Sequence, residues 1–269
     1  MKWLLRIIIG IVAALLIAGI IGFFFIDSLA RSAIESHSGR ALDVQTTLER
    51  ASIKFVDGRI DLYNFDIGNP EGFDETPRFM LLGHGRVDMS FLDLPRRNVE
   101  IERIVLEGIE VHLEHTGLDS NHGTILDNLK TFQGEHDPDP YRKYLVREVV
   151  LRDITVNVSV FLVGGEATRV DLEIPEIVLQ DVGTGDNALS IGEIVDVVTT
   201  SLLAAILHQG ADVLPNAVLE GLGAGLKAVG DTGRFGMTIA GEAFTGIGEL
   251  LDSVLEGLGD VFRDDDEDE

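Results

Sequence analysis

Several residue types are scarce in this sequence, and each scarcity excludes a class of protein. There is no cysteine, which excludes disulfide scaffolds, cysteine-ligated zinc, iron–sulfur clusters and thiol nucleophiles. Only 21 Lys and Arg residues stand against 46 Asp and Glu, so the formal net charge is -25. This acidity argues against a nucleic-acid partner, because phosphate binding requires a basic surface. With 269 residues and a 45% hydrophobic composition, the chain is long enough for one or two domains with a buried core.

The N-terminus contains 20 consecutive uncharged residues, from Ile7 to Ile26. At 1.5 Å per residue this run matches the roughly 30 Å hydrocarbon core of a bilayer, so we predict a transmembrane anchor over 1–26. Lys2 and Arg6 precede the run and predict a cytoplasmic N-terminus, with the rest of the chain on the far side. The alternative is a cleaved signal peptide, for which Ser28–Ala30 offers small residues, but signal peptides usually have apolar regions of only about 7 to 15 residues.

Beyond the anchor, apolar and polar residues alternate with a period of two, which is typical of half-buried strands. The alternation runs from about residue 42 to residue 182, with irregular segments between the strands. Asp57-Gly58 separates two alternating segments and predicts a hairpin with a tight turn. A short helix is expected over 124–130 and a surface loop over 133–140.

Four sites within these strands share one pattern, in which two apolar residues stand three positions apart and the second intervening residue is Asn, Gly or Asp. Apolar residues three apart cannot face the same side of a straight strand, so each site predicts a bulge or bend. A sheet that bends at each pass curls into a concave and a convex face, and the repeated alternation keeps one of the two faces apolar along its length. The four sites are Leu62–Phe65, Leu106–Ile109, Leu151–Ile154 and Leu179–Val182.

The character of the sequence changes near residue 186 to apolar residues spaced three and four apart, which predicts amphipathic helices. We therefore predict a helical region over 186–262, within which Arg234–Ala240 is a candidate for one more strand. Residues 263–269 are almost all acidic and predict a disordered tail, with an electrostatic lure for a basic partner or divalent cations as the alternative.

The segment Asn69-Pro70-Glu71-Gly72-Phe73, together with the anchor and the strand pattern, resembles the AsmA-like family of bacterial envelope proteins. The resemblance covers roughly the first 185 residues and implies that 27–185 form a curved β-groove related to bridge-like lipid transfer proteins. It implies a single-pass protein of the bacterial inner membrane, with the bulk of the chain in the periplasm. The predicted fold class is α+β, with an N-terminal transmembrane helix, a curved antiparallel sheet that forms a groove, and C-terminal amphipathic helices.

The predicted function follows from what covers the apolar face of the sheet. An open face binds the acyl chains of phospholipids, since each buried methylene contributes about 0.8 kcal/mol, and it serves lipid transfer and envelope homeostasis. A face covered by the C-terminal helices makes the chain a tethered scaffold or interaction module with a sealed core, with an envelope protein or a second copy as partner. The groove candidates are Ile60, Leu62, Phe65, Ile67, Leu106, Ile109, Val111, Leu151, Ile154 and Val156.

No motif in the sequence predicts catalysis. Gly221–Lys227 lacks the final Gly-Lys-Ser/Thr of a phosphate loop, so close helix packing is the better interpretation. The polar strand positions, including Asp61 and Asp66, are interpreted as a solvated face. Ordinary exposed histidines explain His112, His115, His122 and His136 better than a metal site does. We therefore expect no enzyme activity, no cofactor, no metal and no nucleic-acid partner.

Overall fold

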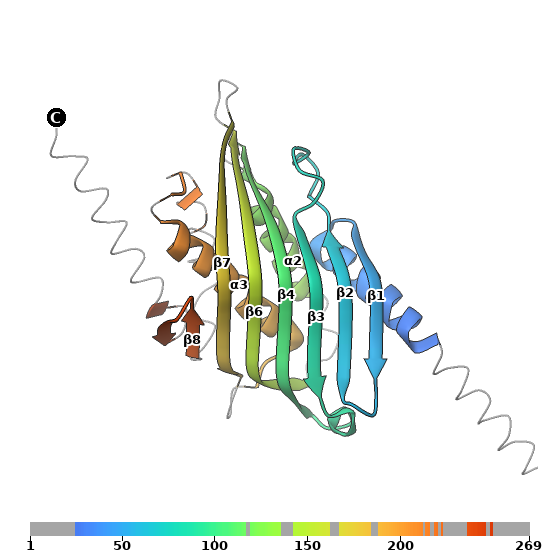
Figure 1. Cartoon of the computed structure of the whole chain (residues 1–269). Helices are drawn as coiled ribbons and strands as arrows, with labels where there is room; N and C mark the ends of the chain where they lie inside the picture. Colours follow the sequence, from blue (N-terminus) through green and yellow to red (C-terminus); the bar gives the residue numbers. More distant parts are fainter. Residues whose placement is uncertain are drawn as a thin grey trace, which may run out of the picture.

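A computed structural model describes residues 25–116, 119–135, 142–161, 167–183, 188–211, 213–215, 218, 219, 222, 236–245 and 248–249. One large sheet dominates this part of the chain, with helices on one side of it (Figure 1). A helix spans residues 25–42. The remaining elements are β1 (Thr46–Lys54), β2 (Arg59–Ile67), β3 (Met80–Met89), the 3₁₀ turn η1 (Phe91–Asp93), β4 (Asn98–Thr116), β5 (Asp119–Ser120), α2 (Asn121–Glu135), β6 (Lys143–Phe161), β7 (Ala167–Val182), α3 (Ile191–Gly210), β8 (Gly236–Ile239) and β9 (Glu242–Thr245).

The described sheet is mixed, with the strand order β1-β2-β3-β4-β6-β7-β8-β9 and β5 paired to β4. Its two longest strands, β4 and β6, run parallel from the pair Asn98 and Lys143 to the pair Thr116 and Phe161. Parallel neighbours need a crossover of a dozen or more residues, and the segment that contains α2 supplies it. The predicted fold class has an antiparallel sheet. It is therefore wrong for the central pair, β4 and β6, which run parallel.

The predicted N-terminal membrane helix finds no support in the described helices. The run from Ile7 to Ile26 lies almost entirely outside the described residues, which begin at Phe25. Among the helices that are described, none combines the length and the apolar character needed to cross a bilayer. What the structure describes is a mixed sheet with helices packed on it.

The strands bend where the four repeated sites predicted a bulge or bend. The third residue of each site has a positive φ: Asn64 at 49°, Gly108 at 67°, Asp153 at 53° and Asp181 at 59°. Asn, Asp and Gly adopt this left-handed conformation more readily than other residues. Pairing resumes with unchanged register beyond Asn64, Gly108 and Asp153, so these three sites are bends without an inserted residue. Because the three residues lie in one row across the sheet, the bends add up to a common crease.

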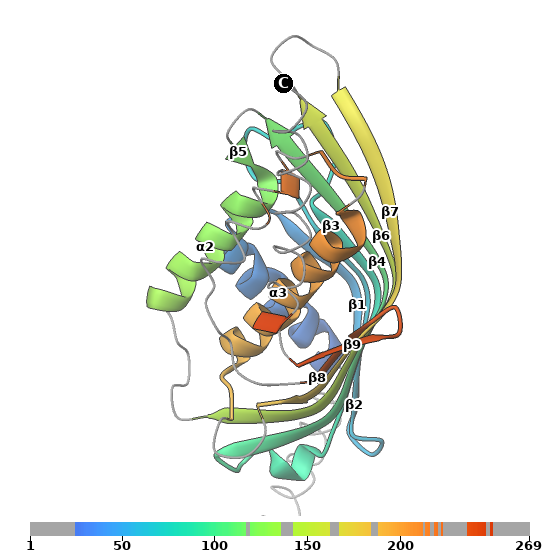
Figure 2. The same cartoon turned by 90° about the vertical axis from the view of Figure 1, so that its left-hand side faces the viewer.

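The crease makes the sheet concave, and α2 and α3 lie on its concave side (Figure 2). The core lies between this face and α3, whose Ala204, Ala205, Ile206 and Leu207 are fully buried. The small side chains at 204 and 205 allow α3 to approach the sheet closely. At the end of α3, Leu214 and Leu172 of β7 lie next to Gly210. The predicted apolar face is thus occupied by the chain's own helix over its central strands.

The outer edge of β1 is covered by the helix 25–42. Asp27 Oδ1 accepts a hydrogen bond from the Ile53 backbone N–H at 2.8 Å, and Glu35 Oε1 accepts one from Leu48 N–H at 2.8 Å. The bond from Leu48 lowers the pKa of Glu35 below its ordinary value. Unpaired edge N–H groups invite another strand, so these two carboxylates protect β1 from edge-to-edge association.

The C-terminal region is only partly helical. Ser190 caps α3 through a capping box, in which Glu193 N–H donates to Ser190 Oγ at 3.2 Å and Ser190 N–H donates to Glu193 Oε2 at 2.6 Å. The candidate strand at Arg234–Ala240 is observed as β8, which pairs with β7 and continues into β9. The helical region predicted over 186–262 is therefore interrupted by strands at 236–245, where β9 was not predicted. The acidic tail 263–269 lies outside the described residues.

The hairpin predicted at Asp57-Gly58 is present, with a loop of four residues between Lys54 and Arg59 in place of a tighter turn. Gly58 has a φ of 62°, and a Cβ atom built on it would lie 2.3 Å from the Met89 carbonyl oxygen. We expect Gly58→Ala to lower the free energy of unfolding by about 2 kcal/mol, because clash and backbone strain act together. Equilibrium urea unfolding measures this loss.

Gly72 provides the matched control for this substitution. Its φ is 94°, but no atom lies within 4 Å of a Cβ built there. Gly72→Ala should therefore cost only the dihedral strain, about 1 kcal/mol. Equal losses for the two variants would contradict the clash at Gly58.

Candidate functional site

The ten predicted groove residues divide into a buried group and a half-buried group. Six are at most 5% exposed, and four are half-buried. The buried residues of the central strands belong to the same apolar cluster as α3, so they are core residues of a covered face. The buried group is Ile67, Ile109, Val111, Leu151, Ile154 and Val156, and the half-buried group is Ile60, Leu62, Phe65 and Leu106.

The segment Asn69–Phe73, on which the predicted resemblance rests, forms a loop that a buried polar network holds against the sheet. The Asn69 side-chain amide donates to the Thr76 carbonyl at 2.8 Å and to Glu114 Oε1 at 3.2 Å. Its amide oxygen accepts from Asn121 Nδ2 at 3.0 Å. The loop also buries Pro70 and Phe73, and Gly72 supplies a turn with positive φ. The motif residue Glu71 is exposed.

Glu114 and Asn121 complete this network from the end of β4 and the start of α2. Glu114 Oε1 accepts from Thr76 N–H at 2.7 Å and also from the Thr76 hydroxyl. Asn121 Oδ1 accepts from Glu114 N–H at 3.0 Å, and Asn121 Nδ2 donates to the His112 carbonyl at 2.8 Å. Because these side chains satisfy backbone groups of both the loop and β4, the role of the segment Asn69–Phe73 here is to fix the loop 68–79.

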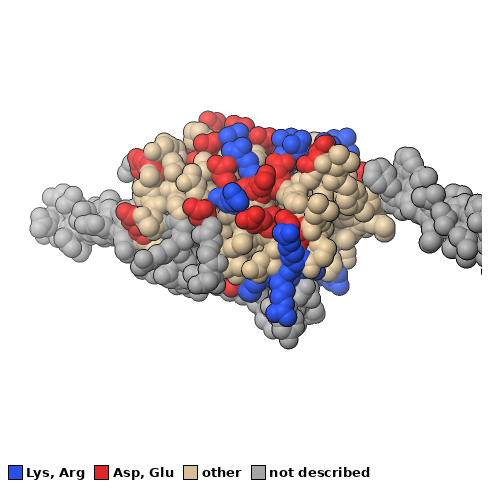
Figure 3. All heavy atoms as spheres, turned by 90° about the horizontal axis from the view of Figure 1, so that it is seen from below, with Lys and Arg blue, Asp and Glu red and all other residues tan. Residues whose placement is uncertain are grey.

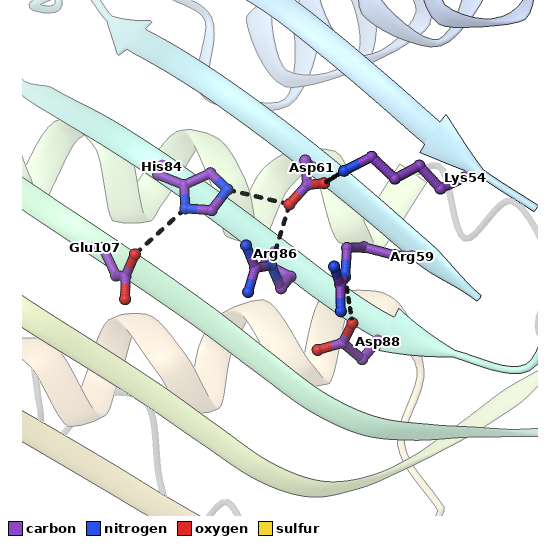
Figure 4. Close-up of polar contacts among 7 residues, drawn as sticks. All are labelled: Lys54, Arg59, Asp61, His84, Arg86, Asp88 and Glu107. Atoms are coloured by element: carbon purple, nitrogen blue, oxygen red, sulfur yellow. Dashed lines mark hydrogen bonds and ion pairs between the residues drawn. The ribbon is translucent and has the colours of Figure 1, made fainter. Parts of the chain in front are cut away.

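The convex face of the sheet carries a network of charged side chains centred on Asp61 (Figure 4). Lys54 Nζ lies 2.9 Å from Asp61 Oδ2, and Arg86 Nε lies 3.1 Å from Asp61 Oδ1. His84 Nε2 contacts Asp61 Oδ1 at 3.1 Å, while His84 Nδ1 contacts Glu107 Oε2 at 3.3 Å. The prediction of a solvated position is wrong for Asp61, which is fully buried beneath its three partners.

The partners of Asp61 fix its charge. Burial alone would raise the pKa of Asp61, but hydrogen bonds from Lys54, Arg86 and His84 outweigh burial and lower this pKa to about 2. His84 also stacks on Tyr63, with ring centroids 4.9 Å apart. The arrangement neutralises charge along the sheet.

His122 is buried in the first turn of α2, which corrects its interpretation as an exposed loop residue. Its Nε2 lies 3.3 Å from Ser120 Oγ. Neither His122 Nδ1 nor His115 Nδ1 has a hydrogen-bond partner, although both atoms are buried. Burial, with a smaller contribution from the nearby His115, lowers the pKa of His122 to about 4. His122 is therefore neutral in the folded protein near pH 7.

Nothing in the described residues forms a metal centre. Groups of three or more His, Asp or Glu side chains with suitable placement are absent there. A shallow depression of about 380 Å³ lies near the β1 edge, with Arg31, Glu49, Asp66 and Arg78 in its lining. Arg78 pairs with Asp66 at 3.2 Å, and neither Asp61 nor His84 lines the depression.

Reasoning from the sequence missed Asp61, Glu114, Asn121 and His122 as buried polar groups. Asn69 had a signal, since it begins the family motif. Asp61, Glu114, Asn121 and His122 occupy positions where a polar residue is expected on an exposed strand or turn. Only the register of the strands and the packing of α2 against the sheet bury these four side chains.

The chain matches no family model and none of the curated proteins to which it was compared.

Proposed function

We propose that the chain is a non-catalytic interaction module of the bacterial envelope, built on a curved sheet whose apolar face packs against its own helix. One observation carries this proposal: six of the ten groove candidates are at most 5% exposed. A core closed in this way leaves the central strands no surface for a transported acyl chain. A partner must then be bound through the outer surfaces, and the net charge of -25 favours a basic one.

The envelope location rests on the sequence. The resemblance of Asn69–Phe73 and its flanking strands to the AsmA-like family supports it. The inner membrane, with the bulk of the chain in the periplasm, stays a prediction from the uncharged run that starts at Ile7 and from Lys2 and Arg6 before it. Alkaline phosphatase fused after residue 269 tests it, since that enzyme is active only outside the cytoplasm.

Phospholipid binding is the second candidate function, and a specific observation favours it. The half-buried residues Ile60, Leu62, Phe65 and Leu106 lie on β2 and β4, toward the β1 side of the sheet. An acyl chain lying against these side chains would bury apolar surface that the helices leave partly exposed.

Native mass spectrometry of the full chain in mild detergent separates the two functions. The interaction module predicts no phospholipid bound in stoichiometric amount. Lipid binding predicts at least one phospholipid per chain, and its loss in Phe65→Glu. Leu81→Glu is the matched control, because Leu81 is half-buried on the neighbouring strand, next to the depression of the convex face.

A cellular assay gives the second readout. The assay measures how far each variant returns the envelope permeability of a deletion strain to the wild-type level. If the chain is an interaction module, Phe65→Glu should complement the strain as well as Leu81→Glu does. Stoichiometric lipid in the wild-type chain, lost together with complementation in Phe65→Glu alone, would overturn the proposal in favour of lipid binding.

A further inference from the structure

One end of the sheet brings together loops from three parts of the chain. These are the β1–β2 turn, the β3–β4 connection that contains η1, and the start of β6. Met89 N–H donates to the Gly58 carbonyl at 2.8 Å, and the rings of Phe55 and Phe91 lie 5.0 Å apart. Lys143 N–H donates to the Arg97 carbonyl at 2.9 Å, which ties β6 to the same end. The loops therefore support one another.

Large apolar side chains project from this end. Val56 is 100% exposed, Leu92 is 87% exposed and Phe55 is 41% exposed. Phe25 and Leu29, both exposed, begin the helix 25–42, whose Asp27 is bonded to Ile53 close to the same end. Five of the seven large apolar residues that are exposed in the described part of the chain thus gather here. Figure 3, a view onto this end, shows uncharged surface beside acidic and basic groups.

The loop segments at this end are richer in basic residues than the chain as a whole. Segments 54–59, 86–97 and 142–147 contain eight basic and three acidic residues, whereas the whole chain has 21 basic and 46 acidic ones. Six of these eight cations are paired with carboxylates: Lys54 and Arg86 with Asp61, Arg59 with Asp88, Arg96 with Asp93, Lys143 with Glu193 and Arg147 with Glu100. Arg97 is exposed at the end of the η1 loop, beside Arg96, which pairs with Asp93.

Exposed aliphatic side chains on loop tips, with cations beside them, have the chemistry of a surface that binds anionic lipid. The aliphatic groups enter the boundary between headgroups and acyl chains, and the cations contact lipid phosphates. The sequence agrees, because the uncharged run from Ile7 to Ile26 includes Phe25, the first residue that the structure describes. A protein partner would have to match two separate protruding loops, one that carries Val56 and one that carries Leu92. A fluid lipid surface accommodates both side chains without such a match.

We propose that this end docks on an anionic lipid surface, with Val56 and Leu92 inserted and with Lys54, Arg96 and Arg97 near the lipid phosphates. We call these residues, together with Phe55, the tip surface. The inference goes beyond the proposed function, because the tip surface orients the sheet against a membrane whether the chain binds a protein on its outer surfaces or a lipid on its concave face.

The absence of cysteine makes the test direct, since one introduced thiol labels one position. The full chain is prepared as Val56→Cys, Leu92→Cys and Thr116→Cys, each labelled with an environment-sensitive nitrobenzoxadiazole dye. Thr116 is exposed at the opposite end of β4 and is the control. In phosphatidylcholine vesicles with 30% phosphatidylglycerol and doxyl lipids, positions 56 and 92 should show blue-shifted emission and at least about twofold more quenching than position 116.

The charges are tested in the Leu92→Cys background. Arg96→Ala with Arg97→Ala should shift the docking equilibrium more than tenfold toward the undocked state, since each cation near an anionic surface contributes about fivefold. Phosphatidylcholine alone, or high salt, should act in the same direction. Circular dichroism checks that each variant is folded.

Three results would overturn the proposal. One is equal quenching at positions 56, 92 and 116. Another is quenching at positions 56 and 92 that changes neither when phosphatidylglycerol is omitted nor when Arg96 and Arg97 are replaced by alanine. The third is a blue shift that rises with protein concentration in lipid-free micelles, which would assign the tip surface to a second copy of the chain.

Discussion

Replacing Glu114 by alanine is expected to lower the free energy of unfolding by about 4 kcal/mol. Glu114 is buried, and one of its oxygens accepts hydrogen bonds from Thr76 N–H at 2.7 Å and from Asn69 Nδ2 at 3.2 Å. Its removal leaves the Thr76 N–H without an acceptor, which costs about 1–3 kcal/mol. Asn69 Nδ2 and the Thr76 hydroxyl each lose one further hydrogen bond, worth about 0.5–1.5 kcal/mol, and keep the Thr76 and Arg78 carbonyls as acceptors. Equilibrium urea unfolding of the full chain gives the difference.

Two further variants make this prediction specific. Glu114→Gln keeps a carbonyl acceptor and should lose less stability than Glu114→Ala. Glu110→Ala, on the same strand, removes a carboxylate that is 42% exposed and paired with His112, and it should change stability by less than about 1 kcal/mol. Limited proteolysis within the loop 68–79 should increase only for the Glu114 variants. A loss at Glu110 as large as that at Glu114 would contradict the assignment of Glu114 to the loop.

The bends of the sheet could be predicted because local sequence determines them. Apolar residues three apart, as in Leu106–Ile109, face one side only if the strand bends between them. The residue that bends, such as Gly108 or Asp153, is of a type that accepts a positive φ. The signal and its cause lie within four residues of each other, so no tertiary information is needed.

The direction of β6 could not be predicted in the same way. Alternating apolar residues look alike in parallel and antiparallel strands that have one buried face. Whether β6 lies parallel to β4 depends on how α2 crosses between them, which is a matter of packing at long range. The short helix expected at 124–130 was a sign of such a crossover, since α2 occupies Asn121–Glu135.

The buried polar groups lay beyond prediction for a related reason. Asp61 alternates correctly as an outward-facing residue, and only Lys54, Arg86 and His84 around it remove it from water. These partners stand 7 to 25 residues away in the sequence and meet Asp61 through the register of β1, β2 and β3. The same register decides which groove candidates α3 covers, so the choice between an open and a sealed face required the structure.

Acidification from pH 6.5 to pH 4 is expected to lower the free energy of unfolding by about 3 kcal/mol through His122 alone. Burial, assisted by the neighbouring His115, lowers the pKa of His122 from its ordinary value of 6.5 to about 4. Between these values the unfolded chain binds a proton that the folded chain does not. The contribution to stability is therefore complete above pH 6.5 and is lost as the pH falls toward 4.

The measurement is urea unfolding at half-unit intervals of pH, with His122→Gln beside the wild-type chain. His122→Gln should remove most of the slope between pH 6.5 and 4. His208→Gln is the control: it changes a histidine paired with Glu242 at 3.1 Å and should keep the slope. Asp61 acts in a separate window, because its pKa falls from 3.8 to about 2 and its contribution is lost only as the pH drops through that range. A wild-type slope that persists unchanged in His122→Gln would show that other groups cause the acid sensitivity.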